Sequence, residues 1–397
     1  ISFSIEHGDC IGLVGPNGEG KTPLLRLLSG HDEPTSGTLQ YKRGLRLGYL
    51  PQDPPLLEDT TLWQFVQAAL VDLLDMEKEL AELAEQLARV TPGDLSQVIF
   101  ASSGSEAVEA ALKTAVLSTG RNGILAFEGG YHGMSSEAQM SLAPDKLVNF
   151  PVPVADSAGI PESVRGEMLV APNNDIDFVR ALLAEQGSHV AGMIVEPFQR
   201  IIPPAPGFLE ALREECDKYG VILIFDEVVT GFRFAYGGVQ SLYGVTPDLC
   251  TLGKLIGGGL PLAAVAGKAD IMSHFDKAKV ATERFVMQIG TLSGNPLAAV
   301  AGLKTLEILR RPGQYERLYE IGNTLMEGIR DRLGAAGHEV QVVGHPTLFD
   351  VVFTSESVEN YRDWLHGTRN QAVEFHAQLK GCLLYTSDAA DDTPCVE

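Results

Sequence analysis

Most of the chain after residue 90 alternates between two hydrophobic patterns. Short apolar runs rich in β-branched residues, such as 97–101 and 221–225, have the length and composition of buried strands. Longer stretches between them, such as 106–117 and 209–219, repeat their apolar positions at helical spacing. Buried strands that alternate with amphipathic helices predict an α/β fold, with a mostly parallel central sheet and helices on both of its faces.

The pattern changes on either side of this region. Residues 301–332 have the pattern of a long helical connection, and the strand-like run 347–353 predicts a small C-terminal α/β domain. The last residues show no core pattern, and the first part of the chain follows a different plan, so we interpret the chain as chimeric. The four expected parts are residues 1–90, a large domain at 91–300, a small domain at 301–380 and a non-native-looking tail at 381–397.

A glycine-rich loop lies near the start of the chain. Gly15, Gly20, Lys21 and Thr22 have the spacing GxxxxGK[ST], between a strand-like run and the helical-spacing run 24–28. In such a loop, glycines let backbone N–H groups converge on a phosphate, the lysine adds positive charge and the hydroxyl can reach a magnesium ion.

The first 90 residues resemble the start of an ABC-type ATPase domain, because the runs 34–37 and 48–52 also follow the pattern of that family. No signature motif of the family follows. Phe225-Asp226-Glu227 looks like the end of a Walker B strand, but its surroundings belong to another family. We therefore expect a vestigial nucleotide loop, with an ABC-type ATP-binding module as an alternative function.

Composition narrows the range of partners and locations. The 30 Lys and Arg residues against 52 Asp and Glu give a formal net charge of -22, which argues against binding to nucleic acid or to an anionic membrane. No apolar stretch of the sequence has the length of a membrane span. The five cysteines show no metal-ligand spacing, so we expect reduced thiols, a cytoplasmic protein and no metal site.

Two residues form the centre of the candidate chemistry. Asp226 ends the apolar run 221–225, and ligands of open α/β sheets bind just beyond the carboxyl ends of the strands. A carboxylate there can cap a helix, or it can pair with the protonated ring nitrogen of pyridoxal phosphate. Lys254 lies farther along the chain among apolar residues and glycines, where its amine can act as a nucleophile.

A run of small residues follows the strand 97–101. Ser103, Gly104 and Ser105 would lie at the N-terminus of the next helix, where backbone N–H groups form an anion site. Ser103 or Ser105 can also act as a plain N-cap, and the two roles are compatible. We expect the run to form an anion-binding site.

Other polar residues reach the same edge of the predicted sheet. Tyr131 and His132 follow a glycine turn, where an aromatic ring can stack on a cofactor or simply pack against the loop. Glu196 ends another strand and brings a second carboxylate to this edge. The polar loop 290–296, which includes Thr291, precedes a helix and offers a further phosphate contact.

Together these motifs resemble the class III (subgroup II) aminotransferases of the type I pyridoxal-phosphate fold. That family includes ω-transaminases, β-amino-acid transaminases and glutamate-1-semialdehyde aminomutase. The match is carried by 206–213, 226–233, 244–249, the Lys254 segment and 290–296. The resemblance implies a pyridoxal 5'-phosphate cofactor and an enzyme that moves an amino group from an amine or amino acid to a keto acid, aldehyde or ketone.

The resemblance also implies a role for each matching residue at the cofactor ring. Lys254 forms the Schiff base with the cofactor, and Asp226 contacts the pyridine nitrogen. Val228 packs on one face of the ring and Tyr131 on the other, with His132 next to it.

For the phosphate, the resemblance implies contacts from Gly104 and Ser105. Glu196 would support the site. Thr291 would reach the phosphate of the neighbouring subunit, which implies a homodimer with shared active sites.

The chain departs from the family pattern at two places. Ile201, preceded by Arg200, stands where ornithine- and GABA-type members carry a second glutamate. The ABC-like segment stands where the family's own N-terminal portion would line the substrate pocket. We therefore expect a transaminase, with glutamate-1-semialdehyde aminomutase-like activity as the alternative, and leave the donor and acceptor open.

Overall fold

The computed structural model describes residues 3–5, 12–13, 20–42, 71–91, 93–144, 146–367 and 369–382. The chain divides into two compact units, Ile1–Val71 and Asp72–Glu397. Gly15, the strand expected before the glycine loop, the run 48–52 and most of the tail lie outside the described residues. The expected domain boundaries at residues 90, 300 and 380 stay predictions.

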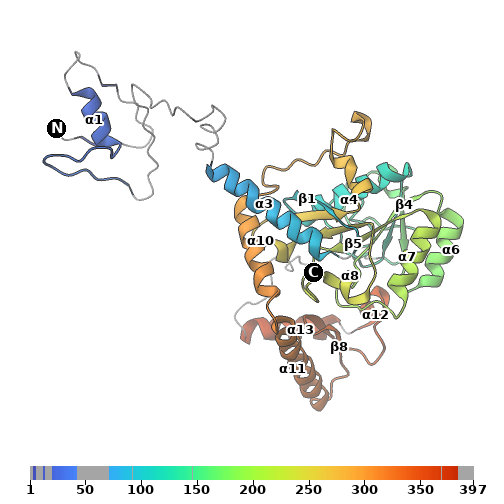
Figure 1. Ribbon diagram of the computed structural model, residues 1–397. Coiled ribbons are helices and arrows are strands. Elements are labelled where there is room, and N and C mark those ends of the chain that lie inside the picture. Colours follow the sequence, from blue (N-terminus) through green and yellow to red (C-terminus); the bar gives the residue numbers. More distant parts are fainter. Residues whose placement is uncertain are drawn as a thin grey trace. The chain divides into compact units, whose positions relative to one another are not determined.

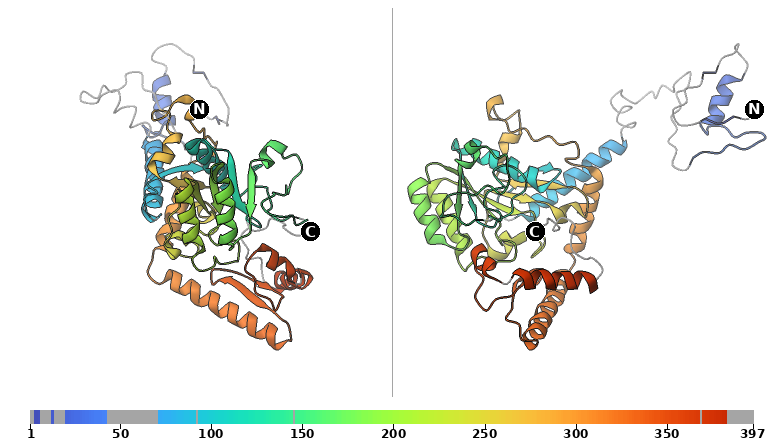
Figure 2. Two further views of the ribbon diagram at one scale, coloured as in Figure 1. Left: turned by 90° about the vertical axis from the view of Figure 1, so that its right-hand side faces the viewer. Right: turned by 180° about the vertical axis from the view of Figure 1, so that it is seen from behind.

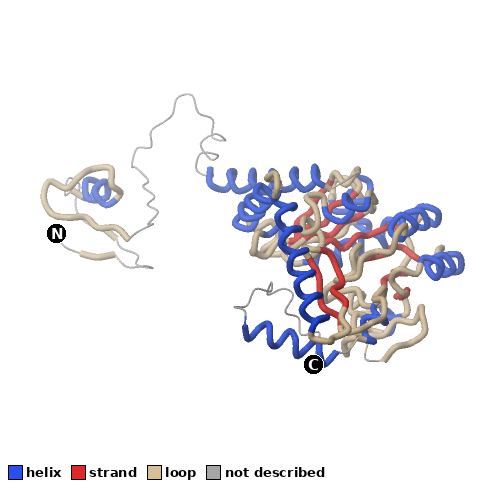
Figure 3. Tube along the Cα trace, turned by 90° about the horizontal axis from the view of Figure 1, so that it is seen from below, coloured by secondary structure: helices blue, strands red, loops and turns tan. Residues whose placement is uncertain are grey.

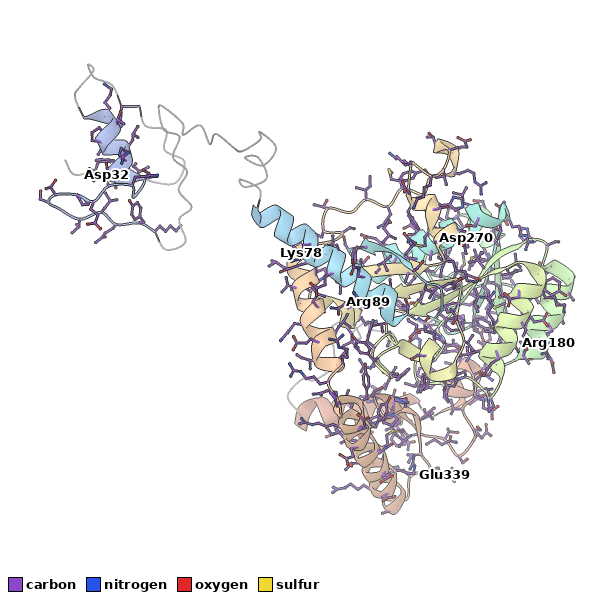
Figure 4. All side chains as sticks on the ribbon, in the orientation of Figure 1. Asp32, Lys78, Arg89, Arg180, Asp270 and Glu339 are labelled. Atoms are coloured by element: carbon purple, nitrogen blue, oxygen red, sulfur yellow. The ribbon has the colours of Figure 1, made fainter. Side chains whose placement is uncertain are left out.

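The first unit contains α1 (Lys21–Leu28), the helix expected after the glycine loop. Gly20 precedes it with φ of 82°, a left-handed conformation that glycine adopts without strain. Asp32, labelled in Figure 4, lies just beyond the helix and forms an ion pair with Arg26, with Nε 2.8 Å from Oδ2. All eight residues of α1 are described, and none of them is buried.

In the described part of the second unit, seven strands form a central sheet (Figure 1). They are β1 (Gln97–Ala101), β2 (Gly123–Phe127), β3 (Met168–Ala171), β4 (Val190–Val195), β5 (Ile222–Glu227), β6 (Leu249–Leu252) and β7 (Ala263–Gly267). Their order is β1-β7-β6-β5-β4-β2-β3. Strand β7 runs antiparallel to both neighbours and the other pairs are parallel. The predicted mostly parallel sheet is confirmed.

Helices cover both faces of this sheet, as Figures 2 and 3 show from three further directions. Helix α4 (Gly104–Thr119) packs on one face, in a core with Ile224 of β5. Helices α6 (Ile176–Gln186) and α7 (Phe208–Tyr219) pack on the other, in a core with Phe225. Successive residues of a strand point to opposite faces, and because both faces are covered, β5 is a continuous apolar run up to Asp226.

A third core joins two long helices to the β6–β7 side of the sheet. In α3 (Val71–Val90), Leu83 and Leu87 are fully buried against Leu306 of α10 (Pro296–Leu309). The expected helical connection at 301–332 is divided between α10 and the next helix. Pro312 lacks an N–H, and Gly313 follows with φ of 82°, which ends one helix and starts the other.

The small C-terminal region contains two antiparallel strands among its described residues. Its elements are α11 (Gln314–Ala335), β8 (Gln341–His345), β9 (Leu348–Val352), α12 (Tyr361–His366) and α13 (Arg369–Cys382). The hydroxyl of Tyr315 donates to the carbonyl of Phe232 at 2.7 Å, and Arg233 Nε donates to the carbonyl of Thr347 at 3.0 Å. These bonds attach the small region to the loop after β5.

Several short helices complete the second unit. They are α5 (Glu162–Arg165), α8 (Gly238–Tyr243), α9 (Ala269–Met272) and the 3-10 helices Lys254–Gly257, Ser273–Phe275 and Thr282–Arg284. Among the residues that the structure describes, no helix combines the length and the apolar character needed to cross a membrane.

Candidate functional site

A cavity of about 280 Å³ lies beyond the carboxyl ends of β4 and β5. Nine of the predicted site residues line it: Ser103, Gly104, Ser105, Tyr131, His132, Glu196, Asp226, Val228 and Lys254. They come from five different chain segments, because the carboxyl ends of β2, β4, β5 and β6 meet at this edge of the sheet. The structure thus brings together residues that are up to 151 positions apart in the sequence, Ser103 and Lys254.

Asp226 is buried at the floor of the cavity and is held by three hydrogen-bonding groups. Its Oδ1 accepts from Thr251 Oγ1 at 2.9 Å and from the backbone N–H of Val228 at 3.2 Å. Its Oδ2 lies 2.8 Å from Nδ1 of His132. A buried carboxylate needs such partners, and three of them fix its orientation.

Thr251 therefore acts on the site through Asp226, whereas His132 both contacts Asp226 and lines the cavity. The Nε2 atom of His132 is buried and has no hydrogen-bond partner among the described residues. Thr251 was not predicted, because a threonine within the apolar strand β6 is simply a good strand former. The parallel register of β5 and β6 places Thr251 directly beside Asp226, and this neighbour relation is the only signal that would have found it.

Glu196 holds the backbone of Tyr131, the residue before His132. Its side chain is buried, and Oε2 accepts from the N–H of Tyr131 at 3.2 Å. Burial raises the pKa of Glu196 above its usual range, and the charges of His132 and Arg200 oppose this shift only in part. The second carboxylate of the site is thus disposed to keep its proton.

Lys254 begins the 3-10 helix that follows β6, and its side chain lines the cavity. Its backbone has φ of 44°, in the left-handed region, which costs a residue with a side chain about 1–2 kcal/mol. Strained backbone of this kind concentrates at functional sites. The conformation supports a functional position for this lysine.

Val228 reaches the cavity between two glycines. A Cβ atom on Gly104 or on Gly253 would lie only 3.0 Å from Cγ1 of Val228. Because neither glycine has a side chain, the isopropyl group of Val228 fits between the start of α4 and the turn that carries Lys254. This explains why small residues precede both the helix and the lysine.

The serines at the start of α4 accept hydrogen bonds from the backbone. Ser103 is the N-cap, and its Oγ accepts from the N–H of Glu106 at 3.3 Å. Ser105 Oγ accepts from the N–H of Met134 at 3.1 Å. The first N–H groups of a helix lack an intrahelical acceptor, so the same turn also offers donors to an anion. The two predicted roles are compatible in this geometry.

Thr291 does not line the cavity of its own chain. It is exposed in the loop before α10. The neighbouring Ser293 lies beside the helix start, with its Oγ 3.3 Å from Oγ of Ser102. The loop is therefore near the start of α4, and Thr291 itself is exposed.

Sequence reasoning missed part of the apolar wall of the cavity. The further lining residues are Ser102, Val108, Gly133, Val229, Leu260, Pro261 and Leu262. Leu260 to Leu262 follow the glycines after Lys254 and enter β7, and nothing in their pattern distinguished them from core residues. Across the described residues, no group of three or more His, Cys, Asp or Glu is arranged to hold a metal ion.

The predicted nucleotide loop is only partly described. Gly20 precedes α1, and Lys21 and Thr22 form its first turn, as expected for the end of a phosphate-binding loop. Gly15 and the rest of the loop lie outside the described residues. A nucleotide site at this loop stays a prediction.

Two family models match the chain. Residues 66–385 match the aminotransferase class-III family, and residues 1–125 match the ABC transporter family. The two matches overlap from residue 66 to residue 125.

Several solved structures are similar to this chain. An omega-transaminase from Sphaerobacter thermophilus is 36% identical, with a TM-score of 0.71, over 80% of this chain and 74% of that protein. A beta-phenylalanine aminotransferase from Variovorax paradoxus is 30% identical, with a TM-score of 0.59, over 73% and 67% of the two chains. A glutamate-1-semialdehyde aminomutase from Pseudomonas aeruginosa PAO1 shares the fold at 24% identity and a TM-score of 0.62, over 74% and 64%.

Proposed function

Since the chain belongs to the class-III aminotransferase family, we propose that Lys254 binds pyridoxal 5'-phosphate covalently and moves the proton during amino-group transfer. The protein is a transaminase that depends on pyridoxal 5'-phosphate and acts on small amine and carbonyl substrates. The observation that supports the role of Lys254 is its place in one cavity with the buried Asp226.

The cavity fits this cofactor in shape and in chemistry. Asp226 offers a buried carboxylate, held by Thr251 and His132, to a protonated ring nitrogen. The start of α4 offers backbone N–H groups and serine hydroxyls to a phosphate. Val228, brought close by two glycines, and the ring of Tyr131 provide packing surfaces for a flat ring.

Asp226 and Lys254 then have defined tasks. Bound pyridoxal phosphate supplies an electron sink for the negative charge that develops on the substrate carbon. Asp226 holds a proton on the ring nitrogen by its negative charge. The amine of Lys254 would take the proton from the substrate carbon as a general base and would deliver it, as a general acid, to the cofactor carbon.

Replacement of Lys254 tests this assignment directly. Lys254→Ala should lose both the visible absorbance of the lysine-bound cofactor and transamination of any amine that the wild type accepts. The control is Lys113→Ala, which removes an exposed lysine of α4 that pairs with Glu109 and should leave both properties unchanged. Normal turnover by Lys254→Ala would show that the assignment is wrong.

We also propose that the protein is a homodimer with shared active sites. Large apolar side chains are exposed around the loop before α10: Met287, Ile289, Leu292 and Leu297. Ile289 is 79% exposed and Leu297 71%, and clustered exposed apolar residues are typical of an interface. A second copy on this surface would bury them and would bring Thr291 of one protomer to the phosphate of the other.

An assay separates transamination from the aminomutase alternative. A transaminase needs a separate carbonyl acceptor for turnover, whereas a mutase converts glutamate-1-semialdehyde alone. We expect turnover of an amine only when a keto acid or aldehyde is present. The likeness to the aminomutase structure shows the fold and does not extend to its substrate.

The remaining proposals concern location and the ABC-like segment. We propose a cytoplasmic protein, which the buried free thiols of Cys216 and Cys250 support. A nucleotide-binding measurement on the wild type and on Lys21→Ala tests the ABC-type alternative, and equal affinities would exclude a role for the glycine loop.

A further inference from the structure

Helix α12 of the small region contacts the turn that leads into Tyr131 and His132. We propose that Arg362 of α12 is a positioning residue for the cofactor site, which it orients through Glu128. This inference rests on the proposed function, because the orientation concerns Tyr131 and His132 as cofactor contacts. It concerns an ion pair on the far side of the turn, outside the cavity.

The ion pair has two-point geometry and a buried carboxylate. Arg362 Nε lies 2.6 Å from Glu128 Oε2, and its Nη2 lies 2.9 Å from Oε1. Nη2 also donates to the carbonyl of Val148 at 2.8 Å, and the guanidinium lies 4.1 Å from the ring centre of Phe150. Glu128 is only 3% exposed, and the loss of one partner from a buried ion pair is strongly destabilising.

The turn that contains Glu128 has two glycines, which allow many backbone conformations, and contacts with other segments hold it in one of them. Only Gly129 and Gly130 separate Glu128 from Tyr131, and glycine restricts the backbone least. Gln199 Nε2 donates to the carbonyl of Glu128 at 2.6 Å, and Arg200 Nε donates to the carbonyl of Gly129 at 2.9 Å.

Helix α12 also covers the turn sterically. Gly129 has φ of 87°, and a Cβ on it would lie 2.7 Å from the side chain of Tyr361. The turn is therefore enclosed between α12 on one side and the loop after β4 on the other.

The far end of the turn is the cofactor site itself. The N–H of Tyr131 donates to Glu196 at 3.2 Å, and Nδ1 of His132 lies 2.8 Å from Asp226. These two bonds and the ion pair between Glu128 and Arg362 are all made by the same short turn. If the turn loses its anchor at Glu128, the two glycines let Tyr131 and His132 move relative to Asp226.

Arg362 is not needed to hold α12 in place. Asn174 Nδ2 donates to the carbonyl of Glu359 at 2.7 Å, just before the helix. The helix start is closed by a capping box between Asn360 and Asp363. Loss of the Arg362 side chain should therefore release the turn more than it releases the helix.

The test compares Arg362→Gln with a matched control, Arg213→Gln. Arg213 also pairs with a mostly buried aspartate, Asp248, at 2.9 Å, but far along the sequence from the turn and outside the cavity. For each variant we would measure the Kd for pyridoxal phosphate by equilibrium dialysis, the visible circular dichroism of the bound cofactor, kcat and KM, and the unfolding midpoint.

We expect Arg362→Gln to bind pyridoxal phosphate more weakly and to change the visible circular dichroism. Its kcat/KM should fall on the order of 10²-fold, the scale for a misplacement of about 1 Å in an active site. Arg362→Lys should be intermediate, because an ammonium group cannot make the two-point contact. The double variant Glu128→Gln/Arg362→Gln should recover part of the loss, because it leaves no buried charge unpaired. Arg213→Gln should lower the unfolding midpoint with the wild-type spectrum and Kd.

Two results would overturn the inference. One is a wild-type Kd and dichroism spectrum in Arg362→Gln, and the other is an equal change in Arg213→Gln. If Arg362→Gln does not fold, Arg362→Lys and Glu128→Gln, which keep the size of each side chain, decide by the same readouts. A wild type that does not bind pyridoxal phosphate at Lys254 would refute the proposed function instead.

Discussion

Gly133→Ala is a direct test of how closely the loop after β2 is packed onto the start of α4. Gly133 has φ of 105°, and a Cβ on it would lie 2.6 Å from Oγ and 2.8 Å from Cα of Ser105. The second of these atoms belongs to the helix backbone and cannot rotate away. The substitution must therefore separate the loop from the helix at the residue proposed to hold the phosphate.

The expected cost has two parts. Positive φ costs alanine about 1–2 kcal/mol, and overpacking costs about 1–3 kcal/mol, so the free energy of unfolding should fall by about 2–5 kcal/mol. Displacement of Ser105 also removes one hydrogen bond to a charged phosphate. Such a bond contributes about 1.5–3 kcal/mol, which corresponds to a Kd for the cofactor weaker by roughly 10- to 150-fold.

Gly120→Ala is the control for this substitution. Gly120 follows α4 at its other end with φ of 68°, and a Cβ there would meet no heavy atom within 4 Å. It should show only the backbone cost of about 1–2 kcal/mol and the wild-type Kd. Denaturant unfolding and equilibrium dialysis measure the two quantities. Equal losses in both variants, or an unchanged Kd in Gly133→Ala, would refute the reasoning.

Three further predictions follow from the site and the exposed surface. Asp226→Asn keeps the shape of the side chain but loses its charge. In steady-state assays kcat should fall on the order of 10²–10³-fold, the loss typical when one electrostatic group is removed from an active site. An unchanged kcat would contradict the role given to the carboxylate. Burial raises the pKa of Glu196, so the folded state keeps this proton to higher pH than the unfolded state, and wild-type stability is lost as pH rises from about 4.3 through the raised value. Glu196→Gln should lack this part of the decline in unfolding measurements from pH 4 to 8, and equal slopes would count against it. Ile289→Asp should shift the protein to a monomer in analytical ultracentrifugation, and a variant that stays dimeric excludes this surface as the interface.

The sequence predicts part of the sheet because both of its faces are covered. Strand β1 is predicted at its observed bounds and β5 nearly so, since strands buried on both faces are continuous apolar runs. The predicted helical connection at 301–332 is two helices in the structure. The boundary at Pro312-Gly313 was missed because the apolar positions keep their helical spacing on both sides of it.

The candidate site is predictable only as far as it depends on strand ends. Asp226 and Glu196 follow apolar strands, so both can be placed at one edge of the sheet from the sequence. Thr251 belongs to the site only because the register of β5 and β6 places it beside Asp226, and the sequence does not reveal that register. Arg362 meets Glu128 across 234 positions of sequence, and no local pattern can indicate a contact formed by the docking of two separate regions.

Val228 sets the spacing between two parts of the proposed cofactor site. Its side chain lies between Gly104, at the proposed phosphate end, and Gly253, beside Lys254. A longer side chain at this position would drive these two points apart, and a shorter one would let them approach. The distance between Lys254 and the start of α4 can thus be changed by substituting one residue. Val228 is therefore the position to vary when the pocket is redesigned for cofactor analogues of different length.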